Sequence, residues 1–134
     1  TRRCDSYGLR QARTFAGEIA SAGLIIVSGL ALGIDTAAHQ GALTVGGNTW
    51  AFLPGGFGHL YPPENLSLAE EIAEKGVLIT EKTLDSQPLR NSFPARNRLV
   101  SGVSAGVLVT AIFFKWAFTS SVSFPAARKS SSLP

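Results

Sequence analysis

The sequence is short of the residues that build disulfides and metal sites: it has one cysteine and two histidines among 134 residues. Because Cys4 has no second cysteine to pair with, an intramolecular disulfide is excluded, and with it the class of stapled secreted scaffolds. His39 and His59 stand far apart, with no cluster of cysteine and histidine around either. We therefore expect no metal site and no bound cofactor.

Long apolar runs are also missing. The longest, residues 107–118, is interrupted by Lys115 and is too short to cross a bilayer. The first residues lead into no apolar run, so no signal peptide is expected. With 45% hydrophobic and 16% charged residues, the composition is that of one packed domain. These features predict a soluble cytoplasmic protein with no membrane partner.

Acidic residues are absent after Asp85, where six basic residues follow. The first thirteen residues carry four arginines against one acid, whereas residues 14–81 carry seven acids against one lysine. Two basic zones thus flank an acidic middle. If folding brings the zones together, they form a positive face suited to a polyanion. The alternative is a solvated surface on which the charges cluster by chance.

Hydrophobic spacing predicts alternating helices and strands. Helices are expected over residues 9–23, from Asp35 or Thr36 to about residue 45, over 64–75, and from near Pro94; strands are expected over 24–27, 49–53, 77–80 and 107–109. Such alternation is typical of an α/β fold with a mostly parallel sheet and helices on both faces. A strand normally precedes the first helix, so we expect an incomplete sheet that lacks this strand.

Right-handed crossovers place every strand-to-helix loop at the carboxyl edge of a parallel sheet, where such folds bind ligands. The expected loops are residues 28–33, 54–63 and 81–93. The first carries Gly29 and Gly33 ahead of a helix, an arrangement that admits a phosphate, although its spacing fits neither dinucleotide-binding nor NTPase motifs. The second has another glycine-rich turn that could hold a phosphate or bring Tyr61 towards a base. Either turn could equally be a tight connection without a ligand.

The segment RNSFPARNR, residues 90–98, places three arginines and an aromatic residue where the third loop enters a helix. Arginine binds phosphate with a forked pair of donors, and Phe93 offers a ring on which an unpaired base stacks. Arg96 and Arg98 would point about 200° apart on a helix, so one of them should have a structural role, such as bracing Asp35. The alternative is that Phe93 packs inward and the arginines are solvated.

No pairing of a nucleophile with a base, no metal cluster and no carboxylate dyad is evident in the sequence. The charged residues of the expected site are mostly cationic, and His59 has no partner nearby. The sequence therefore predicts a protein that binds anions rather than an enzyme.

Taken together, these motifs resemble the bacterial DNA processing protein A family, also called DprA or Smf. The matching stretches occur in the family's order: TRR at 1–3, SYG at 6–8, SGLALGIDTAAH at 28–39, LPGG at 53–56, YP at 61–62, and FPARNR at 93–98. The resemblance implies a Rossmann-like three-layer αβα domain that binds single-stranded DNA. It also implies protection of incoming DNA, loading of the RecA recombinase in natural transformation, and no catalytic turnover.

The resemblance also implies the site residues. Arg2, Arg90 and Phe93 match positions that contact DNA in the family, and Ser28, Gly29 and Gly33 match its phosphate pocket. The remaining expected contacts come from the motif at the helix start: Arg96, Asn97 and Arg98.

Two departures from the family pattern limit what is expected of this chain. Residues 1–109 follow the family, whereas residues 110–134 read as a divergent or inserted segment. Later strands, which carry the family's homodimer contacts, are not in the sequence, so dimerisation and RecA loading are not expected of this chain alone. Two alternatives stay open: an inactive truncated remnant, or an enzyme resembling the lysine-decarboxylase-like phosphoribohydrolases, whose Pro-Gly-Gly turn residues 54–56 share.

Overall fold

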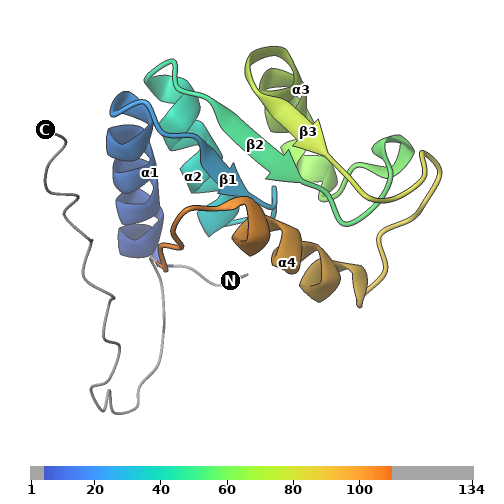
Figure 1. Cartoon of the computed structure of the whole chain (residues 1–134). Helices are drawn as coiled ribbons and strands as arrows, with labels where there is room; N and C mark the ends of the chain where they lie inside the picture. Colours follow the sequence, from blue (N-terminus) through green and yellow to red (C-terminus); the bar gives the residue numbers. More distant parts are fainter. Residues whose placement is uncertain (1–4, 110–134) are drawn as a thin grey trace, which may run out of the picture.

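The computed structural model describes residues 5–109 as alternating helices and strands (Figure 1). In chain order these are α1 (Ser6–Ser21), β1 (Ile26–Ser28), α2 (Ile34–Thr44), β2 (Thr49–Phe52), α3 (Leu66–Lys75), β3 (Val77–Ile79) and α4 (Ser92–Val103). Two short 3-10 turns, Phe57–His59 and Pro63–Asn65, precede α3. None of the helices within residues 5–109 has both the length and the apolar character needed to cross a membrane.

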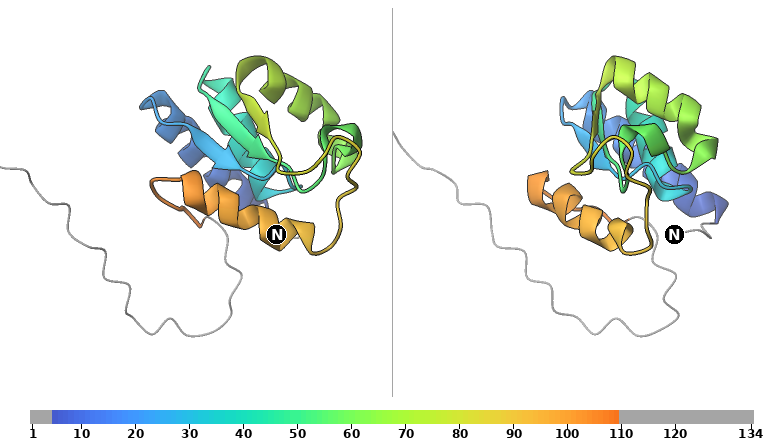
Figure 2. Two further views of the ribbon diagram at one scale, coloured as in Figure 1. Left: turned by 45° about the vertical axis from the view of Figure 1, so that its right-hand side comes forward. Right: turned by 90° about the vertical axis from the view of Figure 1, so that its right-hand side faces the viewer.

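The strands described form one parallel sheet in the order β1-β2-β3. Ala51 in β2 lies between Ser28 of β1 and Leu78 of β3. Helices α2 and α3 cover one face of the sheet and α4 lies against the other, as Figure 2 shows. This arrangement confirms the predicted α/β class with a three-layer, Rossmann-like organisation.

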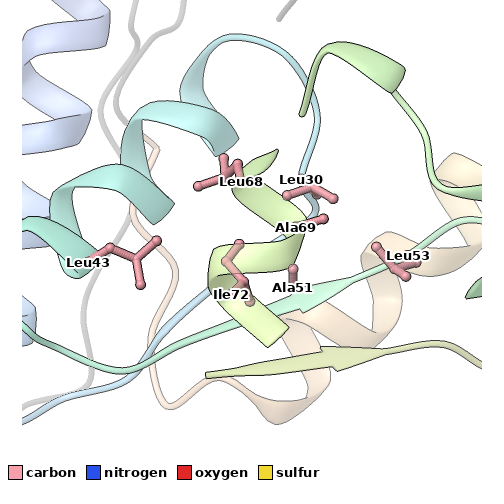
Figure 3. Close-up of a cluster of buried hydrophobic side chains, with 7 residues drawn as sticks. All are labelled: Leu30, Leu43, Ala51, Leu53, Leu68, Ala69 and Ile72. Atoms are coloured by element: carbon pink, nitrogen blue, oxygen red, sulfur yellow. The ribbon is translucent and has the colours of Figure 1, made fainter. Parts of the chain in front are cut away.

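The apolar core lies between the sheet and the helices α2 and α3 (Figure 3). Its members are Leu30, Leu43, Ala51, Leu53, Leu68, Ala69 and Ile72. On the opposite face, the buried residues of α4 are Ser92 and Arg96, both of them polar. Hydrogen bonds from Arg96 to the carbonyls of Gly29 and Phe52 therefore help to hold α4 to the sheet.

The expected strand at residues 107–109 is wrong. This segment forms no strand, and Val107, Leu108 and Val109 are 71%, 57% and 63% exposed. A strand needs a hydrogen-bonded neighbour, and the sheet of residues 5–109 is made of β1, β2 and β3 only. The other boundaries move by a few residues; α4 begins at Ser92, which puts Phe93 and Pro94 into its first turn.

His39, on α2, is fully buried against the sheet and is held in one tautomer. The hydroxyl of Thr49 donates to the Ile26 carbonyl at 2.8 Å, so its oxygen accepts a hydrogen bond from His39 Nδ1–H at 2.7 Å. The other ring nitrogen, Nε2, has no partner within the described part of the chain. Burial lowers the pKa of His39 to about 4; the charge of Asp35 opposes this shift and that of Arg96 adds to it.

We expect this histidine to make the fold acid-sensitive. Its pKa is lower in the folded protein than the ordinary value of 6.5, so its stabilising effect is complete above pH 6.5 and is lost as the pH falls towards 4. The shift corresponds to about 3 kcal/mol of unfolding free energy. Urea denaturation of the wild type and of His39→Gln at several pH values measures it. The variant should lose less stability between pH 7 and pH 4; equal losses would contradict this assignment.

Candidate functional site

The carboxyl ends of all three strands lie at one edge of the sheet, and the loops that follow them converge there with the start of α4 (Figure 1). These loops are residues 29–33, 53–65 and 80–91. This is the edge at which the sequence predicted a ligand site, and its geometry shows which backbone and side-chain groups are free to meet a ligand.

The loop after β1 is held by the carboxylate of Asp35. One oxygen of this side chain accepts hydrogen bonds from the backbone N–H of Gly29 at 3.0 Å and of Ala31 at 3.2 Å. Gly29 is itself buried. The N–H group of Gly29 is therefore occupied by a protein carboxylate, and the place of this glycine in a phosphate pocket stays a prediction.

Leu30, in the same loop, is fixed in an unusual backbone conformation. Its φ is 62°, in the left-handed region that disfavours residues with a side chain, yet its side chain is only 1% exposed and belongs to the core. The buried amide of Asn65 donates to the Leu30 carbonyl at 2.8 Å and to the Thr36 hydroxyl at the same distance. Such strain, of order 1–3 kcal/mol, persists only where surrounding contacts impose it, so the loop has one preformed shape.

Arg96 fastens α4 to the sheet. Its Nη1 donates to the carbonyl of Gly29, just after β1, and to that of Phe52, the last residue of β2. Its Nε donates to the side-chain oxygen of Asn97 at 3.1 Å. The side chain is 6% exposed, and burial lowers its pKa while the charge of Asp35 opposes that shift. Arg96 is thus the member of the arginine pair that has a structural role, and its expected contact with DNA stays a prediction.

Gly29 is required by this contact. A β-carbon at this position would overlap the guanidinium of Arg96. The glycine therefore serves the close approach of a protein side chain to the backbone, which is a different reason from the ligand approach that the sequence suggested.

The second glycine-rich turn is also occupied from within the protein. Gly56 N–H donates to the Ser86 carbonyl at 2.8 Å, and Gly58 N–H donates to the Leu84 carbonyl at 2.9 Å. A β-carbon on Gly56 would overlap the carbonyls of Thr83 and Leu84. These contacts favour the alternative of a tight connection without a ligand, in which the turn anchors the loop that leads from β3 towards α4.

The groups that face solvent at this edge come from the third loop and from α4. Arg90 is exposed in the turn just before the helix, and Phe93 is half-buried in the first turn. Arg98 is exposed and forms an ion pair with Glu81 in which Nη2 lies 2.6 and 2.5 Å from the two carboxylate oxygens. One exposed cation, Arg90, thus stands three residues before Phe93 at the start of α4.

The structure adds one residue that the set of expected contacts lacks. The ring of Tyr61, from the loop after β2, lies against that of Phe93 with centroids 5.7 Å apart and planes at 76°. An aromatic residue beside a glycine-rich turn was the available signal in the sequence. It could not show that two distant segments meet.

Three of the remaining expected residues lie within the described range, at different depths. Ser28 ends β1 and is half-buried, Gly33 precedes α2 with a φ of 95°, and Asn97 is exposed on α4. Arg2 lies outside residues 5–109. Within that range, no group of three or more potential metal-ligating side chains comes together.

Fold and site together define a Rossmann-like α/β domain with an aromatic pair, Tyr61 and Phe93, where a loop at the carboxyl edge of the sheet meets the start of α4. The chain belongs to the DNA recombination-mediator protein A family, whose model matches residues 1–114.

Curated relatives and solved structures agree with this assignment. The chain is 44% identical to protein Smf of Synechocystis over 109 residues and 41% identical to DNA processing protein DprA of Bacillus subtilis over the same length. Those alignments cover 81% of this chain but only 27% and 37% of the two relatives. The chain also matches the DprA structure of Streptococcus pneumoniae, with a TM-score of 0.68 and 38% identity. This match covers 76% of this chain and 36% of the Streptococcus pneumoniae chain.

A second solved structure, which addresses the single-stranded DNA binding mode of DNA processing protein A from Helicobacter pylori, matches equally well. The match covers 75% of this chain and 45% of the Helicobacter pylori chain, with a TM-score of 0.69 and 40% identity. The chain thus spans less than half the length of each of these relatives.

Proposed function

We propose that this chain binds single-stranded DNA at the carboxyl edge of its sheet and acts in the cytoplasm as a recombination accessory protein without catalytic turnover. The observation that carries the proposal is the match, over 75% of this chain, to the Helicobacter pylori protein, which binds single-stranded DNA. The exposed cation Arg90 and the adjoining aromatic ring of Phe93 supply the two kinds of group that such binding needs.

The surface suits a single strand better than a duplex. In a duplex the base faces are stacked on one another, whereas an unpaired base can place a face on Phe93 while Arg90 binds a phosphate. In this proposal Arg2, Ser28, Gly33, Asn97 and Arg98 are further contacts. Gly29 and Arg96 hold the scaffold from within.

The wider proposal concerns the partners. The family resemblance supports RecA recombinase and a second copy of the protein as partners in natural transformation, with residues 1–109 as the DNA-binding part. In this proposal residues 110–134 are a divergent or inserted segment outside the DNA-binding part. The structure describes none of these residues. No observation favours the nucleotide-hydrolysing alternative, because the Pro-Gly-Gly turn on which it rested is packed against residues 83–86.

Fluorescence anisotropy of a labelled single-stranded oligonucleotide tests the proposal. We expect saturable binding that exceeds binding to a matched duplex and weakens with salt. With about three phosphate contacts, affinity should fall roughly 20-fold between about 50 and 200 mM salt. Absent binding, salt-independent binding or equal affinity for the duplex would each contradict the proposal.

A further inference from the structure

Tyr61 and Phe93 form an edge-to-face aromatic pair at the edge where the loops converge. In this geometry the edge of one ring points at the other ring, so each ring covers only part of the face of its neighbour. Tyr61 is 40% exposed and Phe93 is half-buried, so aromatic surface stays open to solvent. Two planes at 76° form the inner walls of a corner.

We propose that Tyr61 is a second base-stacking residue, and that it forms with Phe93 an aromatic corner that receives an unpaired nucleobase. This inference rests on the proposed binding of single-stranded DNA and names a part of the ligand, the base, together with the residue that recognises it. A flat base that stacks on the face of one ring places its own edge against the other ring. Both side chains therefore contact the same nucleotide.

The backbone on both sides of Tyr61 is anchored, which keeps the ring in place before any ligand arrives. Leu60 packs against the apolar core, and Pro62 is buried. A few residues further on, the amide of Asn65 ties this segment to the Leu30 carbonyl of the first loop. A ring that is already positioned loses little conformational entropy on binding, so its contact area adds to affinity with a small ordering cost.

The partner ring is positioned just as firmly. Phe93 belongs to the first turn of α4, and Arg96, one turn later, fixes this helix to the ends of β1 and β2. Arg90 stands three residues before Phe93, in the turn that leads into the helix. A cation that follows the DNA backbone thus adjoins an aromatic surface that takes the base.

The test combines protein variants with a modified ligand. Tyr61→Leu removes the ring and Tyr61→Phe keeps it, and each variant is titrated with an intact single-stranded oligonucleotide and with one of the same length made of abasic residues. We expect Tyr61→Leu to bind the intact strand about 5- to 150-fold more weakly and Tyr61→Phe to bind within about twofold of the wild type. All three proteins should bind the abasic strand alike, because no base is left to stack.

The outcomes separate this inference from the proposed function. If the wild type does not bind the intact strand, the proposed function fails and this inference fails with it. If the wild type binds and Tyr61→Leu binds the intact strand with equal affinity, only the stacking role of Tyr61 is wrong. The same holds if Tyr61→Leu loses affinity by the same factor for the intact and the abasic strand.

A second measurement does not depend on how the variants fold. A strand that carries 5-iodouracil is irradiated with the wild-type protein, and the crosslinked peptides are identified by mass spectrometry. Crosslinks at Tyr61 as well as at Phe93 are the expected result. Crosslinks at Phe93 without any at Tyr61 would overturn the proposal.

Discussion

Arg96→Met is expected to lower the free energy of unfolding by about 2–6 kcal/mol, a large part of the 5–15 kcal/mol typical of a domain. The substitution leaves the carbonyls of Gly29 and Phe52 buried without their donor, and each buried carbonyl without a partner costs about 1–3 kcal/mol. Methionine keeps much of the side chain's bulk, so the loss reports the missing hydrogen bonds rather than a large cavity. Urea denaturation followed by far-UV circular dichroism measures the change.

Arg98→Met is the matched control for this experiment. It removes the same charge from the same helix, but Arg98 is exposed, with its side chain 64% accessible in the ion pair with Glu81. Exposed pairs of this kind contribute at most about 1 kcal/mol. If both variants lost the same stability, the structural role assigned to Arg96 would be wrong.

The alternation of helices and strands was readable from the sequence because each strand is a short apolar run and each helix has a periodic apolar face. Residues 49–53 are an example, since the predicted strand and β2 (Thr49–Phe52) nearly coincide. Residues 107–109 have the same apolar character but form no strand. Local pattern indicates which segments are able to pair, whereas pairing itself depends on a neighbour that the pattern does not contain.

The glycines of the site illustrate a second limit. Gly29 and Gly56 are positions of close approach, and the sequence left open whether a ligand or the protein itself approaches them. In the structure the approaching group is the Arg96 guanidinium at one position and the backbone carbonyls of residues 83 and 84 at the other. A glycine meets the same steric requirement in both cases, so its presence alone cannot distinguish a ligand from the protein itself.

For the arginine motif, helix geometry limits which side chains can point in the same direction, so more of the arrangement could be predicted. Two side chains about 200° apart cannot face one ligand, and Arg96 is indeed buried while Arg98 is exposed. Which of the two lies inside depends on where α4 sits on the sheet, a tertiary fact. The contact of Tyr61 with Phe93 could not be predicted from the sequence for the same reason. It joins the loop after β2 to the start of α4, two segments that only the fold brings together.

Arg90→Glu is expected to weaken binding of single-stranded DNA by about tenfold or more. The arginine is exposed in the turn before α4, so the substitution removes a cation from the phosphate path and puts a repelling charge in its place. Because one phosphate contact is lost, the slope of log affinity against log salt should become shallower by about 0.7. Anisotropy titrations at several salt concentrations give both quantities.

Lys75→Glu supplies the control, since it makes the same change of charge at the end of α3, next to the start of β3 and so at the opposite edge of the sheet. Lys75 is exposed and pairs with Glu71 on its own helix at 2.8 Å, so its replacement should cost little stability. Lys75→Glu should keep close to wild-type affinity, with the salt slope unchanged. If both variants weakened binding equally, net charge alone would explain the effect, and the carboxyl edge of the sheet would not be the binding surface.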